Sequence, residues 1–211
     1  DASNAQTAER QAGLEEARSA AAASPEDVGA WLRLAMAAAA AGETNTELAA
    51  LEQAEQLTKG DSAIRAMRAE AMSRAADGQV TIPARELIAD ILTEDPSEPR
   101  ALFLSGLAAY QDENFGAAVE IWLRLQSLSA PDAPWMALLA DNIADAAQAG
   151  GIDLDAVTAA RGPDAKTMAA AAEMSDEDRA AMIEGMVEGL AARLAEEPGD
   201  AAGWQRLARA Y

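Results

Sequence analysis

Apolar residues recur along most of this chain three or four positions apart, which places them on one face of an α-helix. One such stripe contains Leu48 and Leu51, and a later one contains Met182 and Met186 at i, i+4 spacing. Alanine, the strongest helix former, is abundant, whereas β-branched residues are sparse. The pattern therefore predicts an all-α fold whose helices pack closely through small side chains.

Turn and capping residues divide this pattern into helices joined as antiparallel pairs. The run from Ser24 to Asp27 contains a proline suited to a first helical turn and predicts a helix start capped by Ser24. Gly42 and Gly60 predict the ends of this helix and the next one. The first part of the chain thus contains three predicted helical pairs and a covering helix, over residues 24–42 and 43–60, 62–76 and 83–92, 100–110 and 115–128, and 134–149.

Two segments carry the first-helix signature of a tetratricopeptide (TPR) repeat, in which a Trp, a Leu and a small residue share one helix face. The first contains Trp31 and Leu34, and the second contains Trp204 and Leu207, each leucine being followed by an alanine. Degenerate copies lie between them. The sequence therefore predicts TPR helical-hairpin repeats that form a right-handed superhelical stack with a capping helix, followed by a helical arm.

The third pair predicts a close helix–helix contact, because Gly106 occupies the small-residue position of its first helix. Trp122 and Trp135 are expected in the core. The register of the second pair stays open at this point. Either Ile64 and a neighbouring methionine form its buried pair, or the arginines at 65 and 68 occupy the usual Trp and Leu positions with only their stems buried.

These elements predict four segments. They are an N-terminal polar helix or disordered lead (1–23), a TPR-like repeat domain with a capping helix (24–149), a linker (150–172), and a helix followed by the truncated start of a further repeat (173–211). A first repeat helix without its second leaves an apolar face open. We therefore expect the sequence to be an excised soluble portion of a longer protein, and pairing of the broken repeat with a second copy is a further option.

Charge and residue usage exclude several functions. The net charge of −20 argues against nucleic acid as the main partner, because nucleic acids are bound through dense Lys and Arg. The acidic surface suits a basic partner, and it also serves solubility. The chain has neither cysteine nor histidine, which excludes disulfides, His-based or thiolate metal sites and Ser-His-Asp triads within it.

The remaining candidates for chemistry are acidic clusters. Asp153 and Asp155 resemble the start of a calcium loop, but the Gly and the final Glu that such a loop requires are missing. Glu94, Asp95 and Glu98 share an inter-helix turn without any sign of the partly dry cleft that acid–base chemistry needs. We therefore expect no enzyme activity, no cofactor and no metal.

In TPR stacks the first helix of each pair lines a groove that holds an extended or helical peptide. Apolar residues mixed with arginine in such a groove suit an amphipathic helix or the carboxylate end of a chain. Several of the same side chains could instead be packing between helices. The candidate groove residues are Leu32, Met36, Arg65, Arg68, Arg100, Phe103, Leu107 and Tyr110.

Longer stretches of the chain resemble one family. They are residues 101–110 (ALFLSGLAAY) with 114–122 (NFGAAVEIW), and residues 174–194 (MSDEDRAAMIEGMVEGLAARL) with 198–204 (PGDAAGW). Over roughly residues 24–211 the chain resembles the periplasmic TPR region of the CcmI (CycH) family of cytochrome c maturation proteins. In that family the segment similar to 174–211 leads into further repeats, and a membrane-spanning part is present; both are missing here.

The resemblance implies a chaperone rather than an enzyme. Members hold apocytochrome c, largely through its C-terminal helix, and deliver it to the haem ligation complex in the periplasm. The implied partners are therefore that helix and other haem ligation components. The implied location is the periplasm, as the soluble portion of a membrane-anchored protein, in preference to the cytoplasm. The alternative is a structural TPR adaptor that joins folded subunits of a cell-envelope complex.

Overall fold

The computed structural model of this chain describes residues 2–161, 174–196, 204 and 207. Within these residues every regular element is a helix, which confirms the all-α, TPR-like prediction. The helices are α1 (Ala2–Ala23), α2 (Val28–Ala41), α3 (Thr44–Thr58), α4 (Ser62–Ala75), α5 (Ile82–Glu94), α6 (Pro99–Gln111), α7 (Phe115–Leu128), α8 (Met136–Gly150), α9 (Leu154–Arg161) and α11 (Asp176–Glu196). The chain divides into two compact units, residues 1–157 and residues 158–211.

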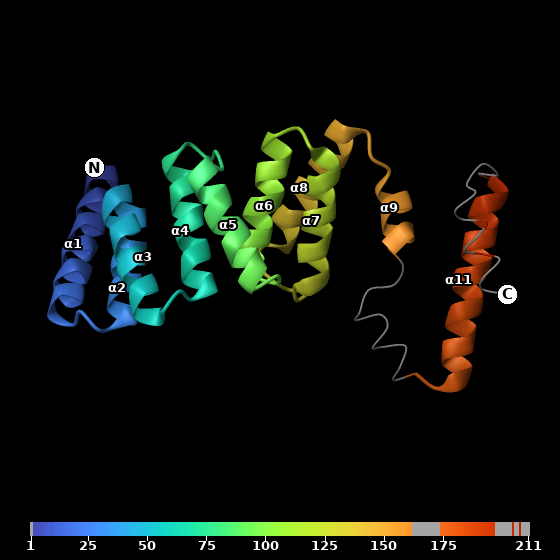
Figure 1. Cartoon of the computed structure of the whole chain (residues 1–211), viewed down its shortest axis with the longest axis horizontal. Helices are drawn as coiled ribbons and strands as arrows, with labels where there is room; N and C mark the ends of the chain where they lie inside the picture. The colour runs from blue at the N-terminus through green and yellow to red at the C-terminus, as the bar shows by residue number, and fades with distance from the viewer. Residues whose placement is uncertain (1, 162–173, 197–203, 205–206, 208–211) are drawn as a thin grey trace. The chain divides into compact units, whose positions relative to one another are not determined.

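In the first unit each helix packs against the next one in the chain, from α1 through α8 (Figure 1). The helical pairs are α2 with α3, α4 with α5, and α6 with α7, and α8 covers α7. Helix α4 also contacts α6, although α5 separates them in the sequence. The first helices of two successive pairs therefore lie side by side, which is the arrangement that creates a groove in a repeat stack.

The predicted start of the first pair is three residues too early. Ser24 does not cap α2, because its own N–H donates to Ala20 O at 3.1 Å and so continues α1. The cap is Asp27, whose carboxylate accepts from Gly29 N at 2.8 Å. At the other end Gly42, with φ of 75°, ends α2 as expected.

The N-terminal segment, left open as a helix or a disordered lead, is the helix α1. Its one large apolar side chain, Leu14, is 1% exposed and packs with Leu34 and Leu51 of the first pair. Ala21 is also buried. Helix α1 therefore covers the outer face of α2, which a repeat stack otherwise leaves open at its end.

The core of α6, α7 and α8 depends on one close contact. Trp122 is 1% exposed and donates from Nε1 to Phe103 O at 3.0 Å. A Cβ at Gly106 would lie 2.3 Å from that Nε1, so glycine is what lets the indole lie across α6. Leu125 and Leu139 complete this core, which we call the α6–α8 core. The predicted close helix–helix contact at Gly106 is confirmed.

The prediction that Trp135 belongs to the core is wrong. Its side chain is 43% exposed, and its Nε1 donates to Ser129 Oγ at 3.2 Å. Trp135 precedes α8 as its capping residue. Leu139 and Ile143 are the residues of α8 that face the core, whereas Leu138 is 58% exposed. Two large apolar side chains thus remain open to solvent at the start of α8.

The segment expected to be a linker, residues 150–172, contains the helix α9. Leu154 and Val157 pack against the α6–α8 core, so this part of the segment belongs to the first unit. Gly151, with φ of 61°, ends α8 just before it. Residues 162–173 of the expected linker lie outside the described residues.

The second unit contains α11, whose start was predicted from a capping box. Ser175 Oγ accepts from Asp178 N at 3.1 Å, as that motif requires. Leu194 is buried, whereas Met186 is 48% exposed. Of the repeat start predicted at 204–211, the described residues include only positions 204 and 207. None of the described helices has both the length and the apolar character needed to cross a membrane.

Candidate functional site

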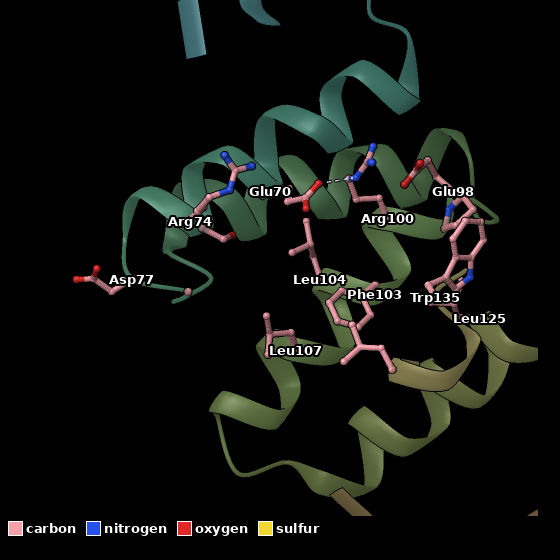
Figure 2. A pocket seen from close by; sticks show the side chains of 14 residues that line it. Glu70, Arg74, Asp77, Glu98, Arg100, Phe103, Leu104, Leu107, Leu125 and Trp135 are labelled. Carbon is pink, nitrogen blue, oxygen red and sulfur yellow. Dashed lines mark ion pairs between the residues drawn. The ribbon is translucent and has the colours of Figure 1, made fainter. Parts of the chain in front are cut away.

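A pocket of about 800 Å³ lies between α4, α6 and the start of α8, on the side where α4 and α6 meet (Figure 2). Helices α4 and α6 are the first helices of successive pairs, so the pocket occupies the groove position of the repeat. Its lining residues are Glu70, Ser73, Arg74, Asp77, Gly78, Glu98, Pro99, Arg100, Phe103, Leu104, Leu107, Leu125, Trp135 and Leu138.

One wall of the pocket is apolar. Phe103 and Leu107 lie one turn apart on α6 and both are partly buried. Trp135 and Leu138, the two exposed apolar residues at the start of α8, also line the pocket. Exposed apolar side chains gathered around a hollow are a mark of a binding site rather than of ordinary surface.

The other wall carries ion pairs. Arg100 Nε lies 2.6 Å from Glu70 Oε2, which joins α6 to α4 across the pocket (Figure 2). Arg74 donates from Nη1 to both carboxylate oxygens of Glu47, at 3.0 and 2.8 Å. Both pocket arginines are therefore already matched by a carboxylate. Their charge is not free to attract an anionic ligand strongly.

Glu98 lies where the pocket meets the start of α6. Its carboxylate accepts from Ala101 N and caps the helix. The side chain is 6% exposed, and this burial raises the pKa of its carboxyl group above the usual value of 4.5, against the lowering effect of the Ala101 N–H and the Arg100 charge. One end of the pocket, at the start of α6, therefore contains a poorly solvated carboxylate.

Three of the predicted groove residues, Arg100, Phe103 and Leu107, line this pocket. Tyr110 does not. Its hydroxyl donates to the Asp145 carboxylate of α8, which raises the pKa of the tyrosine. Part of the predicted α6 face therefore lines the pocket, whereas Tyr110 in the last turn of α6 contacts α8. Binding of a partner by these residues stays a prediction.

The remaining predicted groove residues lie elsewhere. Leu32 packs with the core of α1 to α3, and Met36 on the same helix is 65% exposed, away from the pocket lining. Arg65 and Arg68 lie on α4 but form ion pairs, with Glu94 at 2.6 Å and with Glu55 at 2.8 Å respectively.

These contacts also settle the register of the second pair. Arg65 is 9% exposed and Ile64 is 6% exposed, so residues from both alternatives are buried together. Met67 and Arg68 are partly buried. The arginine stems fill space that large apolar residues fill in the first pair, and their guanidinium groups reach carboxylates of neighbouring helices.

Sequence reasoning missed the pocket residues outside α6. Glu70 and Arg74 are one turn apart on α4, and that spacing was a usable signal that they share a face. Trp135 and Leu138 stand at the start of the predicted capping helix, and this position was a usable signal that they lie near the groove. No group of three or more acidic residues in the described part of the chain is arranged to hold a metal ion. The arrangement suits binding of apolar side chains.

Comparison with known proteins identifies the relatives of this chain. The family model for the cytochrome c-type biogenesis protein H TPR domain matches residues 14–136, from the middle of α1 to the start of α8. A cytochrome c-type biogenesis protein CycH from Rhizobium meliloti (strain 1021) is 35% identical over 195 residues, which are 89% of this chain and 49% of that protein. A protein of the same name from Bradyrhizobium diazoefficiens is 35% identical over 173 residues, which are 74% of this chain and 44% of that protein.

The chain thus spans about half the length of these curated relatives. The family match covers α2 to α7 completely, and these helices contribute most of the pocket lining. The TPR-like pairs, the pocket position and the match over more than half of the chain agree with one another. The chain belongs to the family of cytochrome c-type biogenesis proteins with the CycH-type TPR domain.

Proposed function

We propose that this chain takes part in cytochrome c maturation as a non-catalytic periplasmic chaperone. It holds apocytochrome c through the client's C-terminal helix and presents it to the haem ligation complex. The observation that carries the proposal is the pocket between α4, α6 and α8, with its exposed Trp135 and Leu138. Family membership supplies the context of cytochrome c biogenesis.

The pocket's dimensions and chemistry suit one face of an amphipathic helix. A volume of about 800 Å³ falls in the range of sites that enclose several large side chains. Helix-in-groove recognition places apolar residues at i, i+3 or i+4, and i+7 against a hollow of this kind. The apolar residues of α6 and α8 provide that hollow, and the ion pairs of α4 border it.

The overall charge supports the same client. The net charge of −20 favours encounter with a lysine-rich segment, because long-range attraction raises the association rate. The chain contains no Cys and no His. It therefore cannot form a disulfide with the paired thiols of an unfolded client, nor offer an imidazole in place of the client's own haem ligand.

Titration of a synthetic C-terminal helix from a bacterial c-type cytochrome tests the proposal. Calorimetry of the full chain is compared with Leu138→Gln and Leu128→Gln. Leu138 is 58% exposed and lines the pocket, whereas Leu128 is 53% exposed on α7 and does not. We expect saturable micromolar binding that Leu138→Gln weakens about tenfold, and no change in Leu128→Gln.

Further titrations with unfolded apocytochrome and with the folded cytochrome separate the two functional classes. A chaperone binds the isolated helix and unfolded apocytochrome, and it ignores the folded cytochrome. A structural adaptor binds a folded subunit and leaves the isolated helix unbound. Equal loss of affinity in the Leu138 and Leu128 variants would place the client outside this pocket.

A further inference from the structure

The acidic residue Asp77 stands at the edge of the pocket without a counter-charge. The two pocket arginines are paired, Arg100 with Glu70 and Arg74 with Glu47. By contrast, none of the ion pairs among the described residues includes Asp77. The uncompensated charge at this end of the pocket is therefore negative, and it fits a cationic group on whatever occupies the pocket.

The position of Asp77 is unfavourable for the helix beside it. It follows Ala76, the C-cap of α4, at the end where the backbone carbonyls already carry partial negative charge, so a negative side chain there interacts unfavourably with the helix dipole. Its φ of 53° lies in the left-handed region, which aspartate, like glycine and asparagine, adopts more readily than other residues do. The helix dipole therefore does not favour this aspartate, and Glu113 holds the same kind of position after α6 without lining the pocket. What distinguishes Asp77 is its place in the pocket lining.

Hydrogen bonds of Gln111 fix where this charge lies along the pocket. The Gln111 side chain donates to Gly78 O at 2.8 Å and accepts from Val80 N at 2.9 Å. The turn after α4 is thereby held beside the last residue of α6. Phe103, in the apolar wall, lies eight positions earlier on α6, which is about 12 Å along a helix axis.

Asp77 differs from the other acidic residues that line the pocket. Glu70 is paired with Arg100, and the Glu98 carboxylate accepts from Ala101 N. Figure 2 shows Asp77 at one edge, with its carboxylate directed outward, and Trp135 at the opposite edge beside Leu125. A lysine bound there keeps its ammonium group in water while its stem lies along the apolar surface. The occupant is therefore a helix with a basic residue at one end and large apolar residues at the other.

We propose that Asp77 is a specificity-determining residue that pairs with a Lys or Arg of the bound helix. That basic residue lies about two helical turns from the large apolar side chain seated against Phe103 and Trp135. The inference rests on the proposed function and adds to it a requirement on the client: the spacing between its cationic and apolar anchors. It also fixes which end of the client helix lies at the turn after α4.

The test compares Asp77→Asn with Asp90→Asn in the full chain. Asp90 is an exposed aspartate of α5 outside the pocket lining, and none of the described ion pairs includes it. Both variants remove one negative charge, so they change the net charge equally. Asparagine tolerates the positive φ at position 77 and removes the conflict with the helix dipole, so we expect Asp77→Asn to unfold at the same temperature or higher.

Calorimetry then uses two peptides: a synthetic C-terminal helix of a bacterial c-type cytochrome with a lysine two turns from its main apolar residue, and the same peptide with that lysine changed to glutamine. We expect Asp77→Asn to weaken the lysine peptide about fivefold and to leave the glutamine peptide unchanged. Asp90→Asn leaves both affinities unchanged.

Two results would overturn the inference while the proposed function stands. One is an equal effect of the two variants on the lysine peptide, and the other is an equal loss for both peptides in Asp77→Asn. If the unaltered chain binds neither peptide, the proposed function itself fails. The outcomes are therefore distinguishable within one set of titrations.

Discussion

Two junctions in the first unit are built from different interactions. In the α6–α8 core, Trp122 fills the space left open by Gly106 and is surrounded by leucine. Between α3 and α4 two ion pairs add to the apolar packing, with Arg74 bound to Glu47 and Arg68 bound to Glu55. Both carboxylates come from α3, and the apolar cluster beside them includes Leu51 and Ala71, with Met67 packed against it.

The comparison shows that neighbouring helices of this repeat stack can be held together either by close apolar packing or by apolar packing supplemented with ion pairs. In the α6–α8 core the shape of each side chain matters, because a buried indole leaves no spare volume. At the α3–α4 junction the pairing matters, because a buried carboxylate that loses its cation has no substitute for it. The pocket lies between these regions and takes its apolar wall from one side and its ion pairs from the other.

The largest effect should come from Gly106→Ala. The added Cβ would lie 2.3 Å from Trp122 Nε1 and within 3 Å of two further ring atoms, so the indole or the helix must move. We expect the free energy of unfolding to fall by about 3 kcal/mol, measured by urea denaturation. Movement of the indole would also break the hydrogen bond from Trp122 Nε1 to Phe103 O.

Gly116→Ala is the matched control for this change, because nothing lies within 4 Å of a Cβ at that position of α7. Alanine should stabilise the helix there by up to about 1 kcal/mol. If both variants lose the same free energy of unfolding, the close fit of Trp122 against Gly106 is not what stabilises the α6–α8 core.

A smaller effect is expected at the charged junction. Arg74→Ala leaves Glu47, which is 5% exposed, without its cation, and we expect a loss of about 2 kcal/mol. Glu47→Gln removes the buried charge instead and should cost less. Arg33→Ala is the control, because its pair with Asp27 is exposed on both sides and should contribute less than about 1 kcal/mol. Equal losses of stability in Arg74→Ala and Arg33→Ala would contradict the claim that the ion pair with the buried Glu47 carboxylate stabilises the α3–α4 junction more than an exposed pair does.

The smallest effect concerns pH at the border of the pocket. The folded state raises the pKa of Glu98 above 4.5, so the protonated form is favoured on folding, and the stability that it contributes is lost as pH rises through the raised value. Glu98→Gln keeps an oxygen that can accept from Ala101 N and has no charge to bury. We expect this variant to be at least as stable as the unaltered chain near neutral pH.

That difference should shrink as the pH falls through the raised pKa toward 4.5, because Glu98 of the folded chain then becomes neutral as well. Thermal unfolding at a series of pH values provides the measurement. A stability difference in favour of the variant that grows on acidification would contradict the assignment of burial as the dominant cause.

Much of the fold could be predicted because helix signals are local. Gly42 marked a helix end because glycine adopts the positive φ found there. Gly106 marked a close contact because the absence of a Cβ leaves room for Trp122. The cap is Asp27 and not Ser24, because the Ser24 N–H bonds to Ala20 O at the end of α1. Leu14 was the one clue that α1 has a buried side.

The candidate site was harder to predict because it depends on three helices at once. Phe103 and Leu107 follow from the periodicity of α6 alone. Trp135 was assigned to the core because size and aromaticity usually mean burial, but it is the N-cap residue of α8 and its side chain bonds to Ser129 Oγ at the surface. The ion pairs of Arg65 and Arg68 required knowledge of which acidic residue the next helix supplies.

The central claim is that a client helix lies in the pocket between α4, α6 and α8. The most direct test is photo-crosslinking of the full chain to a cytochrome C-terminal helix peptide that carries a benzophenone on its apolar face, with mass-spectrometric mapping of the product. The account predicts crosslinks at Leu138 and Trp135, with none at Leu128, an equally exposed leucine outside the pocket. Crosslinks confined to Leu128, to Met36 or to residues 158–211 would contradict it.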